Sequence, residues 1–233
     1  MRFPLRYFMA PFYSNNPKFL VAVDCIIFGF QDGKLKLLLQ QRDFEPHRGE
    51  WSLMGGFVQE NEDVDAAAKR VLFELTGLSR IYLKQVGAFG SVGRDSGDRV
   101  VSVAYFALVN IAKVDEELNH YNSAYWANLN ELPPLLFDHQ DMVTCAIDKL
   151  KDMVSRKPVG FNLLPPLFTL TQLQQLYEAI WGEPIDKRNF RKRVTEMPSI
   201  EKTALIDKST SKRGAALYRF NYRTYKEEGD FKI

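Results

Sequence analysis

The chain has 233 residues, of which 45% are hydrophobic and 13% aromatic, and its formal net charge is +2 at pH 7. This length suits a main domain joined to a smaller one, and this composition excludes a disordered chain. No apolar run approaches the roughly 20 residues of a membrane-spanning helix, and the first residues do not resemble a secretory signal. We therefore expect a soluble, cytoplasmic protein with no membrane partner.

The two cysteines and three histidines do not predict a disulfide or a metal cluster. Cys25 and Cys145 stand among apolar residues, which favours reduced thiols in the core. The histidines are scattered, at His47, His120 and His139. We therefore expect no bound metal and no cofactor.

Basic residues concentrate toward the C-terminus. Residues 154–226 contain 14 lysines and arginines against 6 acidic residues, whereas residues 1–153 contain 16 against 20. Residues 154–226 thus carry a net charge of +8, and residues 1–153 carry a net charge of −4. A basic module attached to a mildly acidic one predicts polyanion binding by the C-terminal part.

A hairpin is predicted near the start of the chain. Residues 19–30 are rich in β-branched and aromatic side chains, and a turn at 31–33 separates them from a second strand-like run at 35–41. A loop and short strand rich in glycine follow at 49–57.

Residues 63–75 carry apolar side chains at helical spacing. Gly77 suits the left-handed residue that ends such a helix, and Leu78 suits the hydrophobic contact beside it. Further strands are predicted at 82–89 and 100–109, so the order of elements is mixed α/β.

A second helix is predicted at 140–154, and a domain boundary follows it. Residues 155–166 contain three prolines and a glycine that interrupt both helical and strand patterns. We therefore divide the chain into domains at 1–155 and 156–233.

The C-terminal part predicts two helices separated by a short turn. Thr169 and Gln172 form a capping box before an apolar helical face, and Gly182 follows that helix. Asp186 can cap the second helix, whose buried face contains Phe190, Val194 and Met197. This spacing is typical of a helix-turn-helix.

Two strands are predicted after these helices, at 205–207 and 215–222, around a polar tip at 208–214. A helix-turn-helix followed by such a hairpin indicates a winged helix. The small domain is therefore expected to be an α+β winged helix-turn-helix.

One ordered set of residues carries a family resemblance. Gly56, Glu62, Arg70, Glu74 and the pair Gly77-Leu78 stand at the spacing of the Nudix box. The run from Leu37 to Arg42 and the glycines before the box resemble the family as well, over roughly residues 17–150. The resemblance implies an α/β Nudix fold, with a mixed sheet between helices.

Two glutamates of the Nudix box are replaced, by Val71 and Leu75. In Nudix hydrolases these glutamates hold Mg²⁺ against a nucleoside diphosphate, and Mg²⁺ requires oxygen ligands. We therefore expect no catalytic residues, no metal and no enzyme activity. Glu62, Arg70 and Glu74 are interpreted as an ion-pair remnant, with residual metal binding as the alternative.

The second helix of the C-terminal part is strongly basic opposite its buried face. A helix of this kind can lie in a major groove, and a basic hairpin tip can contact phosphate or the minor groove. Arg219 and Arg223 could support the tip. The candidate DNA-binding residues are Lys187, Arg188, Asn189, Arg191, Lys192, Lys212 and Arg213.

The whole chain is similar to the Nudix-related transcriptional regulators, in which a Nudix domain senses a small molecule and a winged helix binds an operator. The runs beginning at Phe168, Asp186 and Leu217 carry the C-terminal part of this likeness. It implies a homodimeric repressor on a palindromic operator of double-stranded DNA, released by an effector.

The resemblance is closest to a branch from Bacteroidetes that responds to a pentose such as L-arabinose, and this effector is favoured. ADP-ribose or a related NAD metabolite is the alternative. A hydrolase with an accessory nucleic-acid domain, and an RNA-binding or scaffold protein, are further alternatives. The candidate effector-binding residues are Asp24, Gln41, Arg42, Arg48, Glu74, Arg94 and Asp95.

Overall fold

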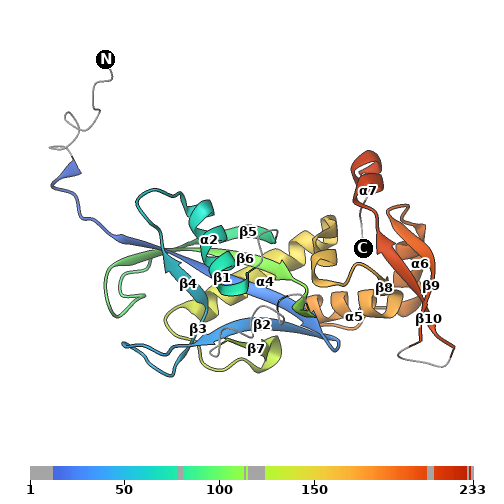
Figure 1. Cartoon of the computed structure of the whole chain (residues 1–233), viewed down its shortest axis with the longest axis horizontal. Coiled ribbons are helices and arrows are strands. Elements are labelled where there is room, and N and C mark those ends of the chain that lie inside the picture. The colour runs from blue at the N-terminus through green and yellow to red at the C-terminus, as the bar shows by residue number, and fades with distance from the viewer. Residues whose placement is uncertain are drawn as a thin grey trace, which may run out of the picture.

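The computed structural model describes residues 13–77, 81–112, 114, 124–208, 213–229 and 231. These residues form a seven-stranded sheet in an N-terminal domain and a three-stranded sheet in a C-terminal domain (Figure 1). Leu78, His120 and Lys212 lie outside the described residues, so the expectations placed on them stay predictions.

The large sheet is mixed, as predicted. Its strands are β1 (Leu20–Gln31), β2 (Lys34–Gln41), β3 (Trp51–Ser52), β4 (Met54–Phe57), β5 (Tyr82–Phe89), β6 (Val100–Val109) and β7 (Ala124–Asn128). They pair in the order β3-β2-β1-β6-β5, with β4 added to β1 and β7 to β2. Strand β1 is parallel to β6 and antiparallel to β2, which confirms the predicted hairpin.

Helices α2 (Val64–Thr76) and α4 (His139–Arg156) cover opposite faces of this sheet (Figure 1). Strand β1 alternates between them, with Cys25 and Ile27 packed on the α2 side and Ile26 and Phe28 on the α4 side. Successive side chains of a strand point to opposite faces, so one strand contributes to both cores.

The predicted ends of α2 are confirmed, because the Asp63 side chain accepts a hydrogen bond from the Ala66 N–H and Gly77 is left-handed with φ 68°.

The expectation that both cysteines are buried is wrong for one of them. Cys145 is exposed on α4, whereas Cys25 is buried as expected. The apolar neighbours of Cys145 in sequence point to other sides of a helix, so sequence proximity does not bury it.

The C-terminal domain is a helix-turn-helix with a three-stranded sheet in the order β8-β10-β9. Two short helices precede it in the chain, η1 (Leu129–Glu131) and η2 (Pro158–Leu163). The elements that follow are β8 (Phe168–Thr169), α5 (Leu170–Trp181), α6 (Lys187–Glu196), β9 (Ile200–Asp207), β10 (Ala215–Phe220) and α7 (Tyr222–Glu228). Both predicted helices are confirmed, with the capping box on α5 and Asp186 capping α6.

The hairpin differs from the prediction at both ends. Strand β9 begins five residues earlier than 205, and there Glu201 pairs in register with Arg219, whose Nε lies 2.7 Å from the Glu201 carboxylate. Strand β10 ends before Asn221, whose side chain accepts hydrogen bonds from the Arg223 and Thr224 N–H groups and begins α7. A cross-strand ion pair and a helix cap therefore set these two boundaries.

The core on the α4 side of the sheet continues into the C-terminal domain. Val154 of α4 and Phe161 of η2 belong to the same buried cluster as Tyr177 of α5 and Phe190 of α6. The two domains are therefore packed together rather than only linked. No helix in the described part of the chain combines the length and apolar character needed to cross a membrane.

Candidate functional site

Arg70 on α2 binds the acidic residues that remain in the Nudix box. Its Nη2 lies 2.6 Å from Glu62 and its Nη1 lies 3.2 Å from Glu74. Nη2 also donates to the Phe57 carbonyl at 3.0 Å, which ties α2 to the loop before it. Hydrogen bonds from Arg70 and from the Gln59 N–H lower the pKa of Glu62. The expected ion pairs among these three residues are present.

The Nudix box does not fit a magnesium ion. Val71 is 2% exposed and packs against Gly56, where an added Cβ would lie 2.9 Å from Val71 Cγ2. Val71 and Leu75 supply no oxygen ligand, and Glu62 and Glu74 both bind Arg70. Among the residues that the structure describes, no group of three or more His, Cys, Asp or Glu is arranged to hold a metal.

Asp24 and Arg94, two candidate effector residues, meet in a buried cluster. Arg94 Nη2 lies 3.7 Å from Asp24 Oδ2, and the Ser102 hydroxyl donates to the same oxygen at 2.5 Å. Arg94 also donates two hydrogen bonds to Asp138, at 2.8 and 2.6 Å. His139 Nε2 lies 3.6 Å from Asp24, and burial lowers the pKa of His139, which favours a neutral ring. The Arg94 guanidinium thus forms ion pairs with two carboxylates, those of Asp24 and Asp138.

Three other candidates lie at the start of, or within, the exposed loop between β2 and β3. Gln41 donates to the Gly49 carbonyl at 3.0 Å, and Arg42 Nε donates to the Pro46 carbonyl at 3.1 Å. Arg48 is exposed on the same loop. Gln41 and Arg48 are exposed and Arg42 is partly exposed, so this loop is accessible to a ligand at the surface.

The loop between β5 and β6 contains the last candidate, Asp95, which accepts a hydrogen bond from the Gly97 N–H at 2.8 Å. The two loops touch, because His47 Nε2 lies 2.8 Å from the Ser96 hydroxyl. The structure therefore joins the loop of Arg42 and Arg48 to the loop of Arg94 and Asp95.

Three residues of this region were missed by the sequence analysis: Phe137, Asp138 and His139. The Phe137 ring lies edge-on to both His47 and His139, with centroids 5.6 Å away in each case. An acidic residue directly before a helix is a local signal, but it predicts a cap, and Asp138 makes no side-chain cap hydrogen bond. Its partner Arg94 is 44 residues away, beyond any local pattern.

Helix α6 presents a basic face to solvent. Phe190 and Val194 are buried, whereas Lys187, Arg188, Asn189 and Lys192 are exposed. Arg191 differs, because it is only partly exposed and its Nη2 donates to the Thr171 hydroxyl of α5 at 3.2 Å. The candidates Lys187, Arg188, Asn189 and Lys192 therefore share an accessible surface, and Arg191 connects the two helices of the motif.

The turn of the β9–β10 hairpin requires a glycine at position 214. Its φ is 70°, and an added Cβ would lie 2.3 Å from Ile206 Cγ2 and 3.0 Å from the Asp207 carbonyl oxygen. Arg213 beside it is exposed. Arg219 is paired with Glu201 and Arg223 with Glu227, so these two arginines already have acidic partners within the domain.

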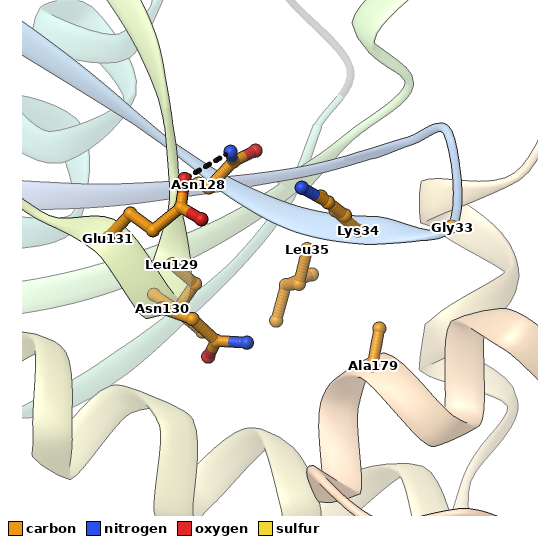
Figure 2. A pocket seen from close by; sticks show the side chains of 8 residues that line it. All are labelled: Gly33, Lys34, Leu35, Asn128, Leu129, Asn130, Glu131 and Ala179. Atoms are coloured by element: carbon orange, nitrogen blue, oxygen red, sulfur yellow. Dashed lines mark hydrogen bonds between the residues drawn. The ribbon is translucent and has the colours of Figure 1, made fainter.

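A small cavity of about 120 Å³ lies between the domains, away from the cluster of Asp24 and Arg94. Figure 2 shows the β1–β2 turn on one side, η1 on another and Ala179 of α5 across from them. Asn128 donates to Glu131 at 2.8 Å at its edge. The complete lining is Gly33, Lys34, Leu35, Asn128, Leu129, Asn130, Glu131 and Ala179.

Two family models match the two domains. The model described as "NUDIX domain" matches residues 18–144, and the one described as "NrtR DNA-binding winged helix domain" matches residues 160–220. A protein of Acinetobacter baylyi named "ADPR responsive transcriptional repressor NtrR" is 38% identical over 216 residues, or 91% of this chain and 86% of that protein. This chain belongs to the NrtR family.

The likeness to NrtR extends to the arrangement of the domains. NrtR of Shewanella oneidensis, solved in complex with a 27mer DNA, is 30% identical, with a TM-score of 0.79 over 88% of this chain and 95% of that one. The expected Nudix fold followed by a winged helix is thus confirmed.

The comparisons do not support the arabinose-responsive branch that we favoured. The Acinetobacter repressor is named for its response to ADPR. A further relative, the "ADP-ribose pyrophosphatase" of Methanocaldococcus jannaschii, is 35% identical over 123 residues, or 53% of this chain and 70% of that protein. The likeness to NrtR favours the ADP-ribose alternative. The arabinose expectation rested on resemblance, because the residues themselves separate the two effectors weakly.

Proposed function

We propose that this NrtR-family chain is a transcriptional repressor that binds operator DNA and releases it when its Nudix domain binds ADP-ribose. The observation that carries the proposal is the likeness to the Acinetobacter repressor, which spans 91% of this chain and therefore both domains. In this proposal residues 1–155 sense the effector and residues 156–233 bind DNA.

The DNA-binding surface consists of the exposed face of α6 and the hairpin tip. Lys187, Arg188, Asn189 and Lys192 are exposed there, and cationic and amide side chains on such a helix reach phosphates and base edges in the major groove. Arg213, with Lys212, contacts the backbone or the minor groove from the tip. Arg191 orients α6 against α5 through Thr171.

The effector site includes the loops next to the buried cluster. ADP-ribose contains a diphosphate, which requires cationic side chains where a divalent ion is not held. Arg42 and Arg48 supply positive charge on the loop between β2 and β3, and Gln41 supplies an amide. Asp24 and Arg94, which are buried, Glu74, which is exposed, and Asp95, which is partly exposed, complete the proposed set of effector residues.

The Nudix domain acts as a receptor rather than as a hydrolase. Hydrolysis of a diphosphate by the family's chemistry needs a metal that polarises the phosphoryl oxygen and activates water. The residues at 71 and 75 cannot ligate Mg²⁺, and Arg70 occupies both remaining glutamates.

Two copies of the chain form the unit that represses. One chain presents one α6 and one hairpin, whereas a palindromic operator offers two half-sites about one helical turn apart, or a multiple of it. Light scattering of the purified protein should report a dimer, and a monomer bound singly to DNA would contradict this part of the proposal.

DNA release tests the central claim. Fluorescence anisotropy should show the full chain binding duplex DNA from the region upstream of its own gene, with weaker binding once ADP-ribose is added. L-arabinose serves as the comparison ligand and should leave the affinity unchanged. Release by arabinose alone, or a protein that ignores duplex DNA at low salt, would sink the proposal.

A separate assay tests the loss of catalysis. The protein is incubated with ADP-ribose and Mg²⁺, and formation of AMP and ribose 5-phosphate is followed by chromatography. We expect no turnover above the protein-free blank. Metal-dependent turnover that disappears in Glu74→Gln would show that the chain is a hydrolase.

A further inference from the structure

The first turn of α4 is attached both to the loop between β5 and β6 and to the residue between β3 and β4. Asp138 accepts two hydrogen bonds from Arg94, in the loop between β5 and β6. The next residue, His139, accepts a hydrogen bond at Nδ1 from the Leu53 N–H at 3.0 Å, directly before β4. A displacement of either segment therefore acts on the same helix end.

Asp138 occupies the cap position of α4 but does not cap it. Its side chain makes no hydrogen bond to the N–H groups of the first turn, and both carboxylate oxygens are directed to Arg94 instead. Asp63 and Asp186, by contrast, cap α2 and α6 with their side chains. The Asp138 side chain thus connects the start of α4 to the loop of Arg94 instead of capping the helix.

The ion pair of Arg94 with Asp138 can be weakened by another anion. The Arg94 side chain is 3% exposed and also faces Asp24 at 3.7 Å, so two carboxylates share one buried cation. The adjoining loops join this cluster to the surface, because His47 contacts Ser96 and its ring packs against Phe137, the residue before Asp138. An anionic ligand held by these loops would add a third negative charge near Arg94 and weaken its attraction to Asp138.

The other end of α4 is packed against the DNA-binding domain. Val154 is fully buried in the last turn, and its carbonyl oxygen accepts a hydrogen bond from the Tyr177 hydroxyl of α5 at 3.4 Å. In η2, which follows α4, Phe161 stacks on Phe220 of β10 with ring centroids 4.3 Å apart. One helix and its extension therefore contact both the helix-turn-helix and the hairpin sheet. Figure 1 shows α4 running behind the large sheet toward that domain.

We propose that α4 couples effector binding to DNA binding, with Asp138 and His139 as the positioning residues that transmit it. The inference rests on the proposed function and adds the route of its regulation. Helix α4 contains 18 residues and is about 27 Å long at 1.5 Å per residue, so a shift at its first turn reaches α5 as movement of one rigid element. A ligand that binds the two positions of α4 unequally shifts DNA affinity.

A second contact between the domains is formed by α5 and β2. Leu35 and Leu37 of β2 belong to the same buried cluster as Leu173 and Leu176 of α5, and the cavity lined by Lys34 and Ala179 lies beside them (Figure 2). This contact is the alternative route between the domains. The contact of Val154 with Tyr177 is buried on both sides.

Asp138→Asn tests the route, because it keeps the size of the side chain and removes its charge. DNA affinity is measured by anisotropy with and without ADP-ribose, ADP-ribose affinity by calorimetry, and folding by Tm. For the wild type we expect ADP-ribose to weaken DNA binding by about 5- to 150-fold, the usual range of such coupling. We call the DNA affinity without ADP-ribose divided by the DNA affinity with it the coupling ratio. In the variant this ratio should approach one, while the protein still binds DNA and still binds ADP-ribose. A merely structural role of Asp138 would not produce this result.

Two further variants complete the test. Lys34→Ala changes the cavity contact and should keep the wild-type ratio. Tyr177→Phe removes only the hydroxyl that bonds Val154 and should reduce the ratio, which tests α4 independently if Asp138→Asn does not fold. A wild-type ratio in both Asp138→Asn and Tyr177→Phe, or loss of the ratio only in Lys34→Ala, would overturn the inference. A wild-type protein that does not bind ADP-ribose would instead overturn the proposed function.

Discussion

Helices α2 and α6 follow the same local rules and use their arginines in opposite ways. Each begins after an aspartate that accepts a hydrogen bond from a backbone N–H, and each buries one apolar face. In α2, Arg70 is held by Glu62 and Glu74. In α6, Lys187, Arg188 and Lys192 lie on an exposed face. Capping and periodicity build both helices, but the partners of the cations decide what each helix can bind.

This difference separates the two proposed roles. A guanidinium with two carboxylate partners contributes to the fold of its own domain, whereas clustered exposed cations attract a polyanion and release its counterions. The experiments below test whether the difference between α2 and α6 is functional, beginning with the largest expected effect.

Phe190→Ala should destabilise the protein by about 3–5 kcal/mol, because it removes a buried aromatic ring that packs against Tyr177. Urea unfolding measures the loss, and DNA binding should fall with it. Phe73→Ala is the matched control on α2, where the ring is 52% exposed, and it should change stability by about 0.5 kcal/mol or less. Equal costs in the two helices would mean that α6 is not anchored as described.

Arg188→Ala should weaken DNA binding by about 1–3 kcal/mol and relax specificity at one operator position, if its side chain reads a base. Competition binding with operator variants measures both effects. Arg70→Ala should lower Tm, because it frees Glu62 and Glu74, yet leave DNA affinity unchanged. If Arg70→Ala weakened DNA binding as much as Arg188→Ala, the contrast between the helices would have no functional meaning.

Arg213→Ala should weaken binding to every duplex alike and lower the salt slope of log Kd by about one, as expected for a phosphate contact. Titrations at several salt concentrations with operator and unrelated DNA provide the measurement. Arg156→Ala removes the same charge from the end of α4, where Arg156 pairs with Asp152, and should leave the slope unchanged. A loss confined to one sequence would instead assign Arg213 to base recognition.

The smallest expected effect is a pH dependence of stability from His139. Burial lowers its folded-state pKa, so on acidification the unfolded chain takes up a proton that the folded chain resists, and stability is lost as the pH falls below the ordinary histidine pKa. Tm should therefore fall between about pH 8 and about pH 5, and less steeply in His139→Asn. Identical slopes would show that other groups cause the change. The charged groups that act on this ring are Asp24, Asp138, Arg94 and Arg42.

The sequence alone determined most helices and strands and showed the replacement of two Nudix-box glutamates. These features depend on near neighbours: Thr169 and Gln172 make a capping box, Gly77 ends a helix, and a run rich in β-branched and aromatic residues makes β1. The replacement of glutamates by Val71 and Leu75 can be read from the sequence. Because Mg²⁺ needs oxygen ligands, this replacement predicts weaker metal binding without a structure. The basic face of α6 follows from its periodicity in the same way.

Only the tertiary structure decided which charges far apart in the sequence meet and how the domains are connected. Arg94 and Asp138 are 44 residues apart, and Tyr177 and Val154 are 23 apart, so their contacts depend on strand register and helix packing. The same is true of the early start of β9, which pairs Glu201 with Arg219 across the sheet. Local patterns describe the neighbours of a residue along the chain, but side chains at long separation meet only through the packing of whole elements.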